Sequence, residues 1–476
     1  MKAVRVQMAG AAAGLLLAAC TPGQSNPSAS SPASGSTVST SSAPSSSVPS
    51  SNSPAASVDW PTYHGDLERS GFNASMPAAS GTLTAKRIRL DGNVYASPIV
   101  VHPSASPSSF SVLIVATENN SVYGLSVDGV QRWKVNLGAP TPRSALPCGN
   151  IDPLGITGTP IYDAASDSVF VVASLGTTVR HDLVALDPAS GAVRWRRSVD
   201  LPGTDPRAMQ QRGALSVLGG RVWVPFGGLF GDCGAYKGRV VGAPLRNGEP
   251  IEYTVPTIRQ AGIWAPPGPT VFGNRMFLAV GNGESVGERY DFSDSVLELD
   301  RTKLVDSFSP DTWAADNRAD LDLGSQGPTV VQGKWIFIAG KSGTGYVLRI
   351  GRLGGIGGEV SQARVCDSYG GTAVVGDTVY VPCSDGLRAI RISASGVISE
   401  LWHAQSSIAG SPVVGGGRVY SLDQAAGVLY ALNPATGRTR ERVTVGETTR
   451  FATPAISGSK LIVPTLSGVT VVQTAR

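Results

Sequence analysis

A short motif recurs eight times along this chain of 476 residues. Each copy begins with a small residue or proline, followed by a short apolar run, a turn and a stronger apolar run. The copies are anchored at these positions: Pro98, Pro160, Ala214, Pro269, Pro328, Thr372, Pro412 and Pro454. Their spacing is roughly 40–45 residues in the second half of the chain and longer in the first half, which is the period of a propeller blade.

Each unit also contains several predicted strands. The second unit has runs at 159–162, 169–173, 183–187 and 193–199. Its last two strands are joined by a turn, 187–191, that Asp opens through its side chain and Gly closes at positive φ. The chain has 58 Gly and 33 Pro, and their spread along it excludes long helices. Four antiparallel strands in each of eight units predict an all-β, eight-bladed propeller.

The two ends of the repeat region suggest how the ring closes. The last unit ends at Arg476 after three predicted strands, 453–457, 460–465 and 469–474. Segment 83–92, which precedes the first anchor, aligns with the fourth strands of other units. We therefore expect an N-terminal strand to complete the last blade, which would remove the open edges of the sheet.

Residues 1–19 have the pattern of a secretory signal peptide. Lys2 and Arg5 precede an apolar run, Met8–Leu17, that is too short to span a bilayer. The run ends in Leu17-Ala18-Ala19-Cys20, which resembles the bacterial lipobox and predicts cleavage before Cys20 and acylation of that residue. An ordinary cleavage site followed by an unrelated Cys is the alternative. Acyl chains would anchor the protein in membrane lipid without spanning the membrane.

Residues 20–58 separate this anchor from the propeller, which is predicted to cover 59–476. The segment has no charged residue and is mostly Ser, Pro, Ala and Thr. Such a composition cannot offset chain entropy, so we expect a disordered tether. The predicted location is the cell envelope, at the outer leaflet of the cytoplasmic membrane, or at an outer membrane if the host has one.

The charge of the chain excludes one class of function. The formal net charge is +4, and about half of it belongs to the leader. The body contains no basic run, whereas nucleic-acid binding needs a clustered basic surface. We therefore expect no nucleic-acid partner.

The five cysteines are Cys20, Cys148, Cys233, Cys366 and Cys383. Acylation of Cys20 would leave an even number, and disulfides persist in exported proteins. Four cysteines allow three connectivities. None of the spacings is C-x-x-C, so the pattern does not indicate a zinc or redox site of that kind.

Two sequence motifs point to a known family. The first is Asp59-Trp60-Pro61-Thr62-Tyr63-His64-Gly65-Asp66, followed by Arg69-Ser70-Gly71. The second is Ala185-Leu186-Asp187-x-x-x-Gly191-x-x-x-Trp195, repeated in part at 431–437. With the eight repeats, they resemble the quinoprotein-like family of pyrroloquinoline quinone (PQQ) repeat propellers over about residues 59–476. A lipoprotein of this kind is similar to the bacterial PQQ-like repeat lipoproteins, which include an outer-membrane assembly factor.

The resemblance implies either an enzyme or a binding protein. The alcohol dehydrogenases of the family have an adjacent Cys-Cys disulfide over the cofactor, and no Cys-Cys dipeptide occurs here. Their Glu/Asn/Asp calcium set and catalytic Asp match no motif of this chain. We therefore expect no cofactor, no metal and no catalytic residue. A PQQ-dependent alcohol or sugar dehydrogenase, with PQQ and Ca²⁺, is the alternative.

Long insertions mark one face of the predicted propeller. Loops from the fourth strand to the next first strand, and from second to third strands, share that face. The insertions are nearly all of these kinds: 138–158, 175–181, 226–238, 281–294 and 307–326. This elaboration predicts a binding surface, with drift without a ligand as the alternative. The candidate ligand-binding residues are Arg143, Asp152, Asp232, Lys237, Glu284, Arg289 and Asp294.

The same map assigns the disulfides and weighs a metal site. Cys148 and Cys233 fall in loops of that face near each other, as do Cys366 and Cys383, so these are the predicted pairs, with buried free thiols as the alternative. Four acidic residues provide oxygen ligands of the type that a hard cation prefers: Glu284, Glu288, Asp291 and Asp294. Their spacing favours a solvated acidic loop instead. The four histidines form no metal-spaced pair: His64, His102, His181 and His403.

Together these features predict a membrane-tethered extracytoplasmic lipoprotein. Its propeller is expected to act as a non-enzymatic binding or scaffold domain for a protein, peptide or glycan. The alternatives are the PQQ-dependent oxidoreductase and an outer-membrane protein assembly factor.

Overall fold

The computed structural model describes residues 60–104, 110–287 and 289–474. By compactness the chain divides into Met1–Ser53 and Pro54–Arg476, and the described residues all belong to the second unit. The predicted signal peptide, the tether, Cys20 and Glu288 lie outside the described residues. Within the described ranges, no helix is long and apolar enough to cross a membrane.

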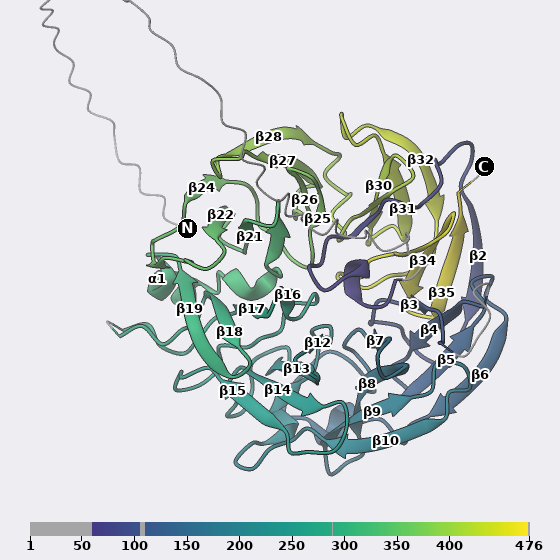
Figure 1. Cartoon of the computed structure of the whole chain (residues 1–476), viewed down its shortest axis with the longest axis horizontal. Helices are drawn as coiled ribbons and strands as arrows, with labels where there is room; N and C mark the ends of the chain where they lie inside the picture. Colours follow the sequence, from purple (N-terminus) through teal and green to yellow (C-terminus); the bar gives the residue numbers. More distant parts are fainter. Residues whose placement is uncertain (1–59, 105–109, 288, 475–476) are drawn as a thin grey trace, which may run out of the picture. The chain divides into compact units, whose positions relative to one another are not determined.

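The structure confirms an eight-bladed β-propeller of mostly four-stranded antiparallel sheets (Figure 1). The first blade has β3 (Ile99–Val101), β4 (Val112–Ala116), β5 (Ser121–Leu125) and β6 (Gln131–Asn136). The second has β7 (Ile161–Asp163), β8 (Ser168–Leu175), β9 (Arg180–Leu186) and β10 (Val193–Ser198). The third has β12 (Ser216–Leu218), β13 (Arg221–Gly228), β14 (Arg239–Pro244) and β15 (Ile251–Thr254), with β11 (Met209–Gln210) paired to β13. The fourth has β16 (Thr270–Phe272), β17 (Arg275–Val280), β18 (Ser295–Asp300) and β19 (Lys303–Ser309), with β23 (Gly355–Ile356) parallel to β19.

The remaining blades follow the same order. The fifth has β20 (Thr329–Val331), β21 (Trp335–Ala339), β22 (Thr344–Arg349) and β24 (Ser361–Arg364). The sixth has β25 (Ala373–Val375), β26 (Thr378–Val381), β27 (Arg388–Ile392) and β28 (Ile398–His403). The seventh has β29 (Val413–Gly415), β30 (Arg418–Asp423), β31 (Val428–Leu432) and β32 (Thr439–Thr444), with β1 (Phe72–Asn73) parallel to β29. The eighth has β33 (Ala455–Ser457), β34 (Lys460–Thr465), β35 (Gly468–Gln473) and β2 (Thr84–Arg89).

The eighth sheet contains strands from both ends of the described chain. β2 pairs antiparallel with β35, from Thr84 opposite Gln473 to Arg89 opposite Gly468. The outer strand of this sheet is therefore N-terminal, whereas its three inner strands are C-terminal.

The predicted β architecture is confirmed, with one short helix, α1 (Trp313–Ala319), in the predicted insertion 307–326. Short 3₁₀ turns also occur at η2 (Arg143–Ala145), η3 (Pro206–Ala208) and η4 (Leu323–Ser325). One expectation about the insertions needs correction. Segment 175–181 is not a long insertion. β8 runs to Leu175 and β9 begins at Arg180, so only a tight turn connects them.

The apolar core lies between neighbouring blades. β4 and β5 are buried along their whole length, whereas β6, the fourth strand of the same blade, alternates between exposed and buried residues. One cluster packs Ile114 of the first blade with Val171 and Val184 of the second. The inner strands therefore read as continuous apolar runs because both of their faces meet another sheet.

A tryptophan links some blades to the next. Trp133 on β6 donates its indole N–H to the carbonyl of Pro188 in the next blade (3.2 Å). Its ring lies where a Cβ on Gly191 would sit, 2.4 Å from the nearest carbon. Trp402 and Gly437 repeat this arrangement between the sixth and seventh blades. The recurring Asp/Asn-x-x-x-Gly turn is therefore a docking surface for the preceding blade.

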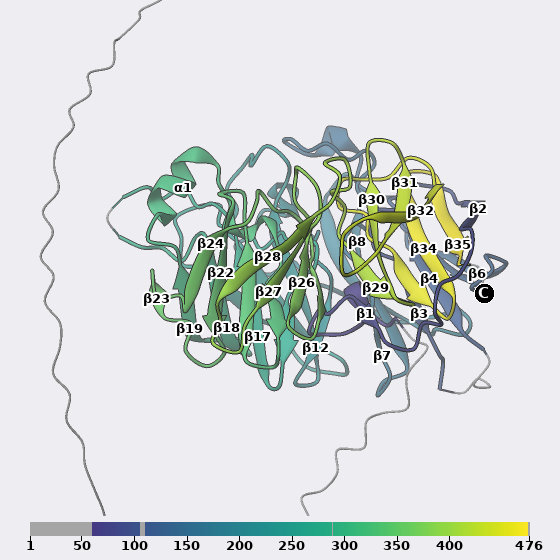
Figure 2. The same cartoon turned by 90° about the horizontal axis from the view of Figure 1, so that it is seen from above.

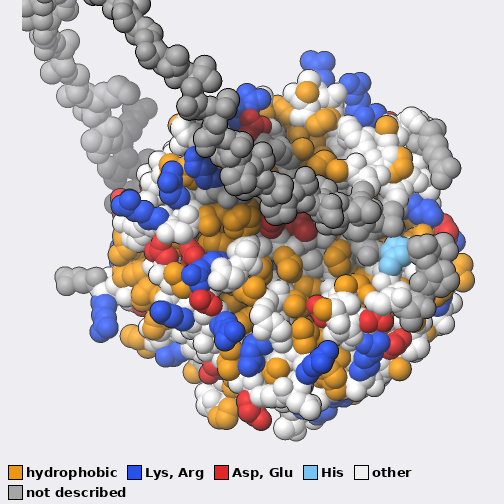
Figure 3. Space-filling model, viewed as in Figure 1, with side chains coloured by type: hydrophobic (Ala, Val, Ile, Leu, Met, Phe, Trp, Pro, Cys, Tyr) orange, Lys and Arg blue, Asp and Glu red, His pale blue; other side chains and the backbone are white. Residues whose placement is uncertain are grey.

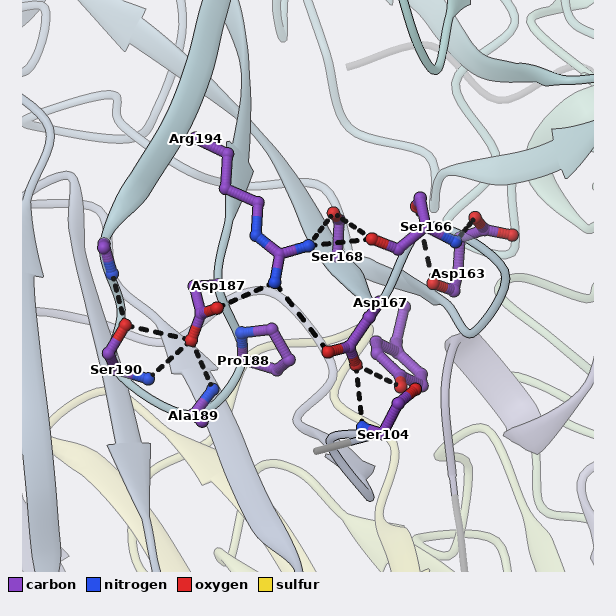
Figure 4. A network of polar contacts seen from close by, with 12 residues as sticks. Ser104, Asp163, Ser166, Asp167, Ser168, Asp187, Pro188, Ala189, Ser190 and Arg194 are labelled. Carbon is purple, nitrogen blue, oxygen red and sulfur yellow. Dashed lines mark hydrogen bonds and ion pairs between the residues drawn. The ribbon is translucent and has the colours of Figure 1, made fainter. Parts of the chain in front are cut away.

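Arg194 on β10 ties the same turn to the turn between β7 and β8 of its own blade (Figure 4). Its guanidinium is 2.7 Å from a carboxylate oxygen of Asp187 and 3.8 Å from one of Asp167. Asp167 in turn accepts a hydrogen bond from the backbone N–H of Ser104 in the first blade (3.0 Å). On the face seen in Figure 3, basic, acidic and apolar side chains are intermixed.

The N-terminal segment 60–73, here called the plug, occupies the middle of the ring, where Figure 1 shows η1 (Tyr63–Gly65) in purple. It forms backbone hydrogen bonds to the first strands of five blades: Trp60 to Val100, Pro61 to Tyr162, Leu67 to Val271, Ser70 to Val374 and Gly71 to Val414. These bonds join segments that are distant in the sequence, so the plug connects most of the ring through its centre.

Two buried side chains of the plug add further links. Arg69 is 1% exposed and donates to the carbonyls of Leu215 and Pro269, 3.0 Å each. His64 is fully buried, and its Nδ1 lies 2.9 Å from the carbonyl of Thr372. The first family motif therefore has a structural role at the centre of the ring.

Candidate binding face

The loops that lead from a fourth strand to the next first strand are called entry loops here. α1 belongs to the entry loop of the fifth blade, and Figure 2 shows it at one end of the strands, whereas β1 of the plug lies nearer the other end. The entry loops therefore approach the centre of the ring from the side opposite to the plug. We call this side the entry face.

Aromatic and arginine side chains of several entry loops meet at the centre of this face. The guanidinium of Arg212 lies 4.4 Å from the ring centre of Phe451 and 5.9 Å from that of Tyr95. Trp264 meets Phe451 edge to face at 6.1 Å. Arg212, Phe451, Tyr95 and Trp264 lie in the entry loops of the third, eighth, first and fourth blades, respectively. The fold therefore brings together side chains that are separated by hundreds of residues. Arginine over an aromatic face is a favourable cation–π contact.

A second pair extends the same cluster. The guanidinium of Arg450 lies 3.8 Å from the ring centre of Tyr369, which enters the sixth blade. We call the six residues the central cluster: Tyr95, Arg212, Trp264, Tyr369, Arg450 and Phe451. Such planar and cationic groups suit ligands with apolar or π surfaces and negative charge.

Glu118 lies close to Arg212 and is buried. One carboxylate oxygen accepts hydrogen bonds from the N–H of Gly155 (2.7 Å) and the hydroxyl of Thr157 (3.2 Å), while Oε1 has no hydrogen-bond partner. Burial raises the pKa of Glu118 to about 7, against the lowering effect of these bonds and of Arg212. The carboxyl therefore exchanges a proton near neutral pH.

Arg259 connects the loops of the third and fourth blades on the entry face. Its NH1 donates to the carbonyl of Asp232 (3.2 Å), and its Nε lies 3.3 Å from a carboxylate oxygen of Glu284. The neighbouring Gln260 bridges to Lys237 on one side and Gly283 on the other. Three of the predicted ligand-binding residues, Asp232, Lys237 and Glu284, are thus brought together.

Both predicted disulfides are present in the structure. Cys148 bonds to Cys233 with a Cα–Cα distance of 5.9 Å, and Cys366 bonds to Cys383 at 5.6 Å. The first bond joins the entry loop of the second blade to the second-to-third-strand loop of the third blade. It therefore holds the loop of Arg143 and Asp152 beside that of Asp232.

The other predicted site residues have different surroundings. Arg143 bonds within its own loop, to the carbonyls of Gly149 and Leu146 (2.9 Å each), and its N–H donates to Asp152. Arg289 is exposed. Asp294 is fully buried and accepts a hydrogen bond from the N–H of Leu323 (3.0 Å), so it holds the entry loop of the fifth blade from inside.

No metal site is shown among the described residues. Calcium takes six to eight oxygen ligands, and the described ranges contain no group of three or more His, Cys, Asp or Glu placed to hold a metal. Asp291 uses its oxygens for the hydroxyls of Thr257 (2.7 Å) and Ser293 (2.6 Å). The disulfides join residues that are 85 and 17 apart in sequence, unlike the adjacent pair of the dehydrogenases.

The central cluster was missed from sequence because charged residues in long insertions were ranked first. A signal for part of it exists in the repeat itself. Tyr95, Tyr369 and Phe451 each stand three residues before an anchor, in three different units. Aligning the positions before the anchors, rather than the insertions, would have found them.

Comparison with known proteins relates the chain to a family. The model of the PQQ-repeat family described as outer membrane protein assembly factor BamB matches residues 28–286, more than half of the chain. No curated protein sequence matches the chain.

Several solved structures have a similar fold. The quinohemoprotein alcohol dehydrogenase from Comamonas testosteroni has a TM-score of 0.66 at 16% identity, covering 89% of this chain and 82% of that one. BamB from Moraxella catarrhalis has 0.54 at 19%, covering 83% and 98%. A europium-containing methanol dehydrogenase has 0.66 at 13%, covering 88% and 98%. At such identities the likeness establishes the fold alone.

Proposed function

This chain belongs to the PQQ-repeat propeller family described as outer membrane protein assembly factor BamB, and on that basis we propose that it is a non-enzymatic binding or scaffold protein. The proposed protein is an extracytoplasmic lipoprotein, tethered to membrane lipid through an acylated Cys20. Its entry face binds a protein, peptide or glycan. Membrane lipid and this ligand are the proposed partners, and nucleic acid is not among them.

The convergence of aromatic and arginine side chains in the central cluster is the observation that carries this proposal. Arg212, Trp264 and Phe451 come from the entry loops of three different blades, and Phe451 contacts both Arg212 and Trp264. Sites on rigid scaffolds are commonly built from such loops.

Two alternatives remain as candidates. A PQQ-dependent oxidoreductase is favoured by the likeness to two dehydrogenase structures, each with a TM-score of 0.66. Purified protein would be incubated with PQQ and Ca²⁺, and dye reduction measured with alcohols and sugars. We expect no turnover, and clear turnover would reject the binding proposal. The second alternative, an outer-membrane protein assembly factor, is favoured by the description of the matched family and requires a two-membrane host.

Photo-crosslinking in intact cells tests the binding role directly. A benzophenone amino acid would replace Tyr369, which is half-buried in the central cluster, or Val130, which is 63% exposed on a turn between third and fourth strands. We expect discrete adducts from position 369 and none from position 130. Equal adducts from both positions, or none from either, would contradict the proposal. Palmitate labelling of the wild type and of Cys20→Ser tests the anchor.

A further inference from the structure

Three large apolar side chains are exposed around Arg259 on the entry face. Phe230 is 69% exposed, Ile258 77% and Val286 42%. Each lies within two residues of a group that Arg259 bonds or of Arg259 itself. Single exposed apolar residues are ordinary, whereas several gathered on one surface mark an interaction site. We call Phe230, Ile258 and Val286 the apolar triad.

The triad sits on turns that the structure holds firmly. The turn of Phe230 is closed by a hydrogen bond from the N–H of Asp232 to the carbonyl of Leu229 (2.9 Å). The carbonyl of Val286 accepts a hydrogen bond from the guanidinium of Arg318 in α1 (3.0 Å). The residue after Ile258 is also held, because the carbonyl of Arg259 accepts a hydrogen bond from the backbone N–H of Glu284 (3.3 Å). The side chains are therefore presented on a fixed base, which lowers the entropic cost of binding.

The acidic side chains near the triad have polar partners, whereas two basic side chains have no ion pair among the described residues. Glu284 pairs with Arg259, and a carboxylate oxygen of Asp232 accepts from the hydroxyl of Tyr236 (2.5 Å). Lys237 and Arg289, by contrast, make no ion pair among the described residues. Among the described residues, the loops that carry Phe230 and Val286 thus each have one cationic side chain without an ion pair, while the carboxylates of Glu284 and Asp232 are already engaged.

We propose that the apolar triad, with Lys237 and Arg289, binds an acidic peptide segment of a partner protein that carries large apolar side chains. This inference rests on the proposed binding function and names its ligand class. Charge complementarity selects an acidic partner. Aliphatic tips together with Phe230 suit apolar side chains better than a glycan, which would stack on flat aromatic faces.

Selection from a random peptide library tests the ligand class. A phage library displaying 12-residue peptides would be selected on the immobilised full-length protein, and enriched peptides would be synthesised for affinity measurement. We expect enriched sequences with net negative charge and several large apolar residues. Their binding should weaken as salt is raised, because exposed charges are screened. Enrichment of basic or wholly polar sequences, or no enrichment, would overturn the proposal.

Matched variants locate the site of binding. The double variants Phe230→Ser/Ile258→Ser and Lys237→Glu/Arg289→Glu should each bind the selected peptides at least about 10-fold more weakly. The control Val130→Ser/Val397→Ser removes two residues that are 63% and 57% exposed elsewhere, and should bind as the wild type does. Equal binding by all variants would overturn the proposal.

The outcome can be separated from that of the proposed function. If the peptides fail but crosslinking from position 369 persists, only the peptide assignment to the triad is rejected. If both fail, the binding role of the entry face is rejected as well. The thermal unfolding midpoints of the variants should match that of the wild type, because all of the substituted side chains reach solvent.

Discussion

Burial shifts the pKa values of two side chains, His64 and Glu118, in opposite directions. Burial lowers the pKa of His64 to about 3. Its Nδ1 faces a carbonyl, so that nitrogen carries the proton of the neutral ring, and Nε2 lies 3.0 Å from the hydroxyl oxygen of Thr453. The stability that neutral His64 contributes is present above pH 6.5 and is lost as the pH falls towards 3. Glu118 behaves in the reverse way, because its pKa is raised.

Glu118→Gln should flatten the pH dependence of stability on the alkaline side. The pKa of Glu118 rises from 4.5 to about 7, so its contribution is full below pH 4.5 and is lost as the pH rises through 7. The wild type should therefore lose on the order of 3 kcal/mol between pH 4.5 and pH 8 through this group. Urea unfolding at pH 5 and pH 8 measures the loss, which should largely disappear in the variant.

An exposed glutamate provides the comparison for this experiment. Glu447→Gln removes a carboxyl at the surface and should keep the pH dependence of the wild type. If Glu118→Gln also keeps that dependence, Glu118 is ionised in the folded protein at both pH values and its burial does not control its proton.

Arg69→Met should destabilise the propeller strongly, since one side chain serves several acceptors. Besides Leu215 and Pro269, the guanidinium donates to the hydroxyls of Thr62 (2.8 Å) and Ser216 (2.6 Å). Each buried acceptor left without a partner costs about 1–3 kcal/mol, so a loss of at least about 3 kcal/mol is expected. Chemical unfolding measures it. Arg440→Met, at an exposed position, should change stability by less than about 0.5 kcal/mol, and an equally small effect at Arg69 would show that the plug contributes little.

At the scale of elements, the blades are joined by repeated contacts as well as by their loops. Trp133 and Trp402 both dock on the turn of the next blade, and both turns have a glycine under the ring. The third blade lacks this turn. There Arg197 covers the ring of Trp195 at 4.3 Å and donates to the carbonyl of Arg246 (2.8 Å). The docking is thus a local property of particular blade pairs.

Gly191→Ala measures this docking when compared with Gly176→Ala. Both glycines have positive φ, +74° and +67°, so alanine costs about 1 kcal/mol of backbone strain at either position. At Gly191 the new methyl would also overlap the ring of Trp133, whereas nothing lies within 4 Å of it at Gly176. We expect Gly191→Ala to be less stable than Gly176→Ala by about 1–3 kcal/mol in urea unfolding. Equal losses would mean that the Trp133 ring moves aside freely.

The elements differ in how far the sequence could predict them. β34 was predicted with the bounds that the structure has, 460–465, because it is an apolar run that recurs in other units. α1 occurs in a single insertion, so no other unit provides a pattern to compare. The plug has no periodicity, and its position depends on backbone bonds to strands hundreds of residues away.

The sequence predicted which face of the propeller carries the candidate site, but not which side chains meet at its centre. The predicted loops placed Asp232 and Glu284 on the same face, and in the structure both bond to Arg259. The position of a loop could be predicted because it depends on the repeat alone. The burial of Asp294 could not be predicted, since it depends on how the entry loop of the fifth blade packs. The arginine–aromatic contacts of the central cluster likewise depend on the angle between blades, which no local pattern encodes.

At the scale of the whole molecule, the N-terminal region contacts the ring at two places: the plug bonds to strands around the centre, and β2 pairs with β35 at the periphery. The plug and β2 are consecutive parts of the N-terminal region. The same short stretch of chain thus contacts the first strands of several blades and supplies the outer strand of the eighth. β2 also covers the edge of β35, whose N–H and C=O groups would otherwise be available for pairing with another chain.

We expect the pairing of β2 with β35 to close the ring, and an engineered disulfide tests it. Thr84 stands opposite Gln473, so Thr84→Cys/Gln473→Cys should form a bond, whereas Lys86→Cys/Gln473→Cys places the second cysteine two residues out of register. Diagonal neighbours are about 7–8 Å apart, which is too far for a disulfide. Mass mapping of non-reduced peptides should find the bond in the first variant alone, and that variant should be about 2–4 kcal/mol more stable than the second. A bond in both variants or in neither would contradict the register. A bond without added stability would show that joining the ends contributes nothing to the fold, which would leave the plug as the main element that holds the ring together.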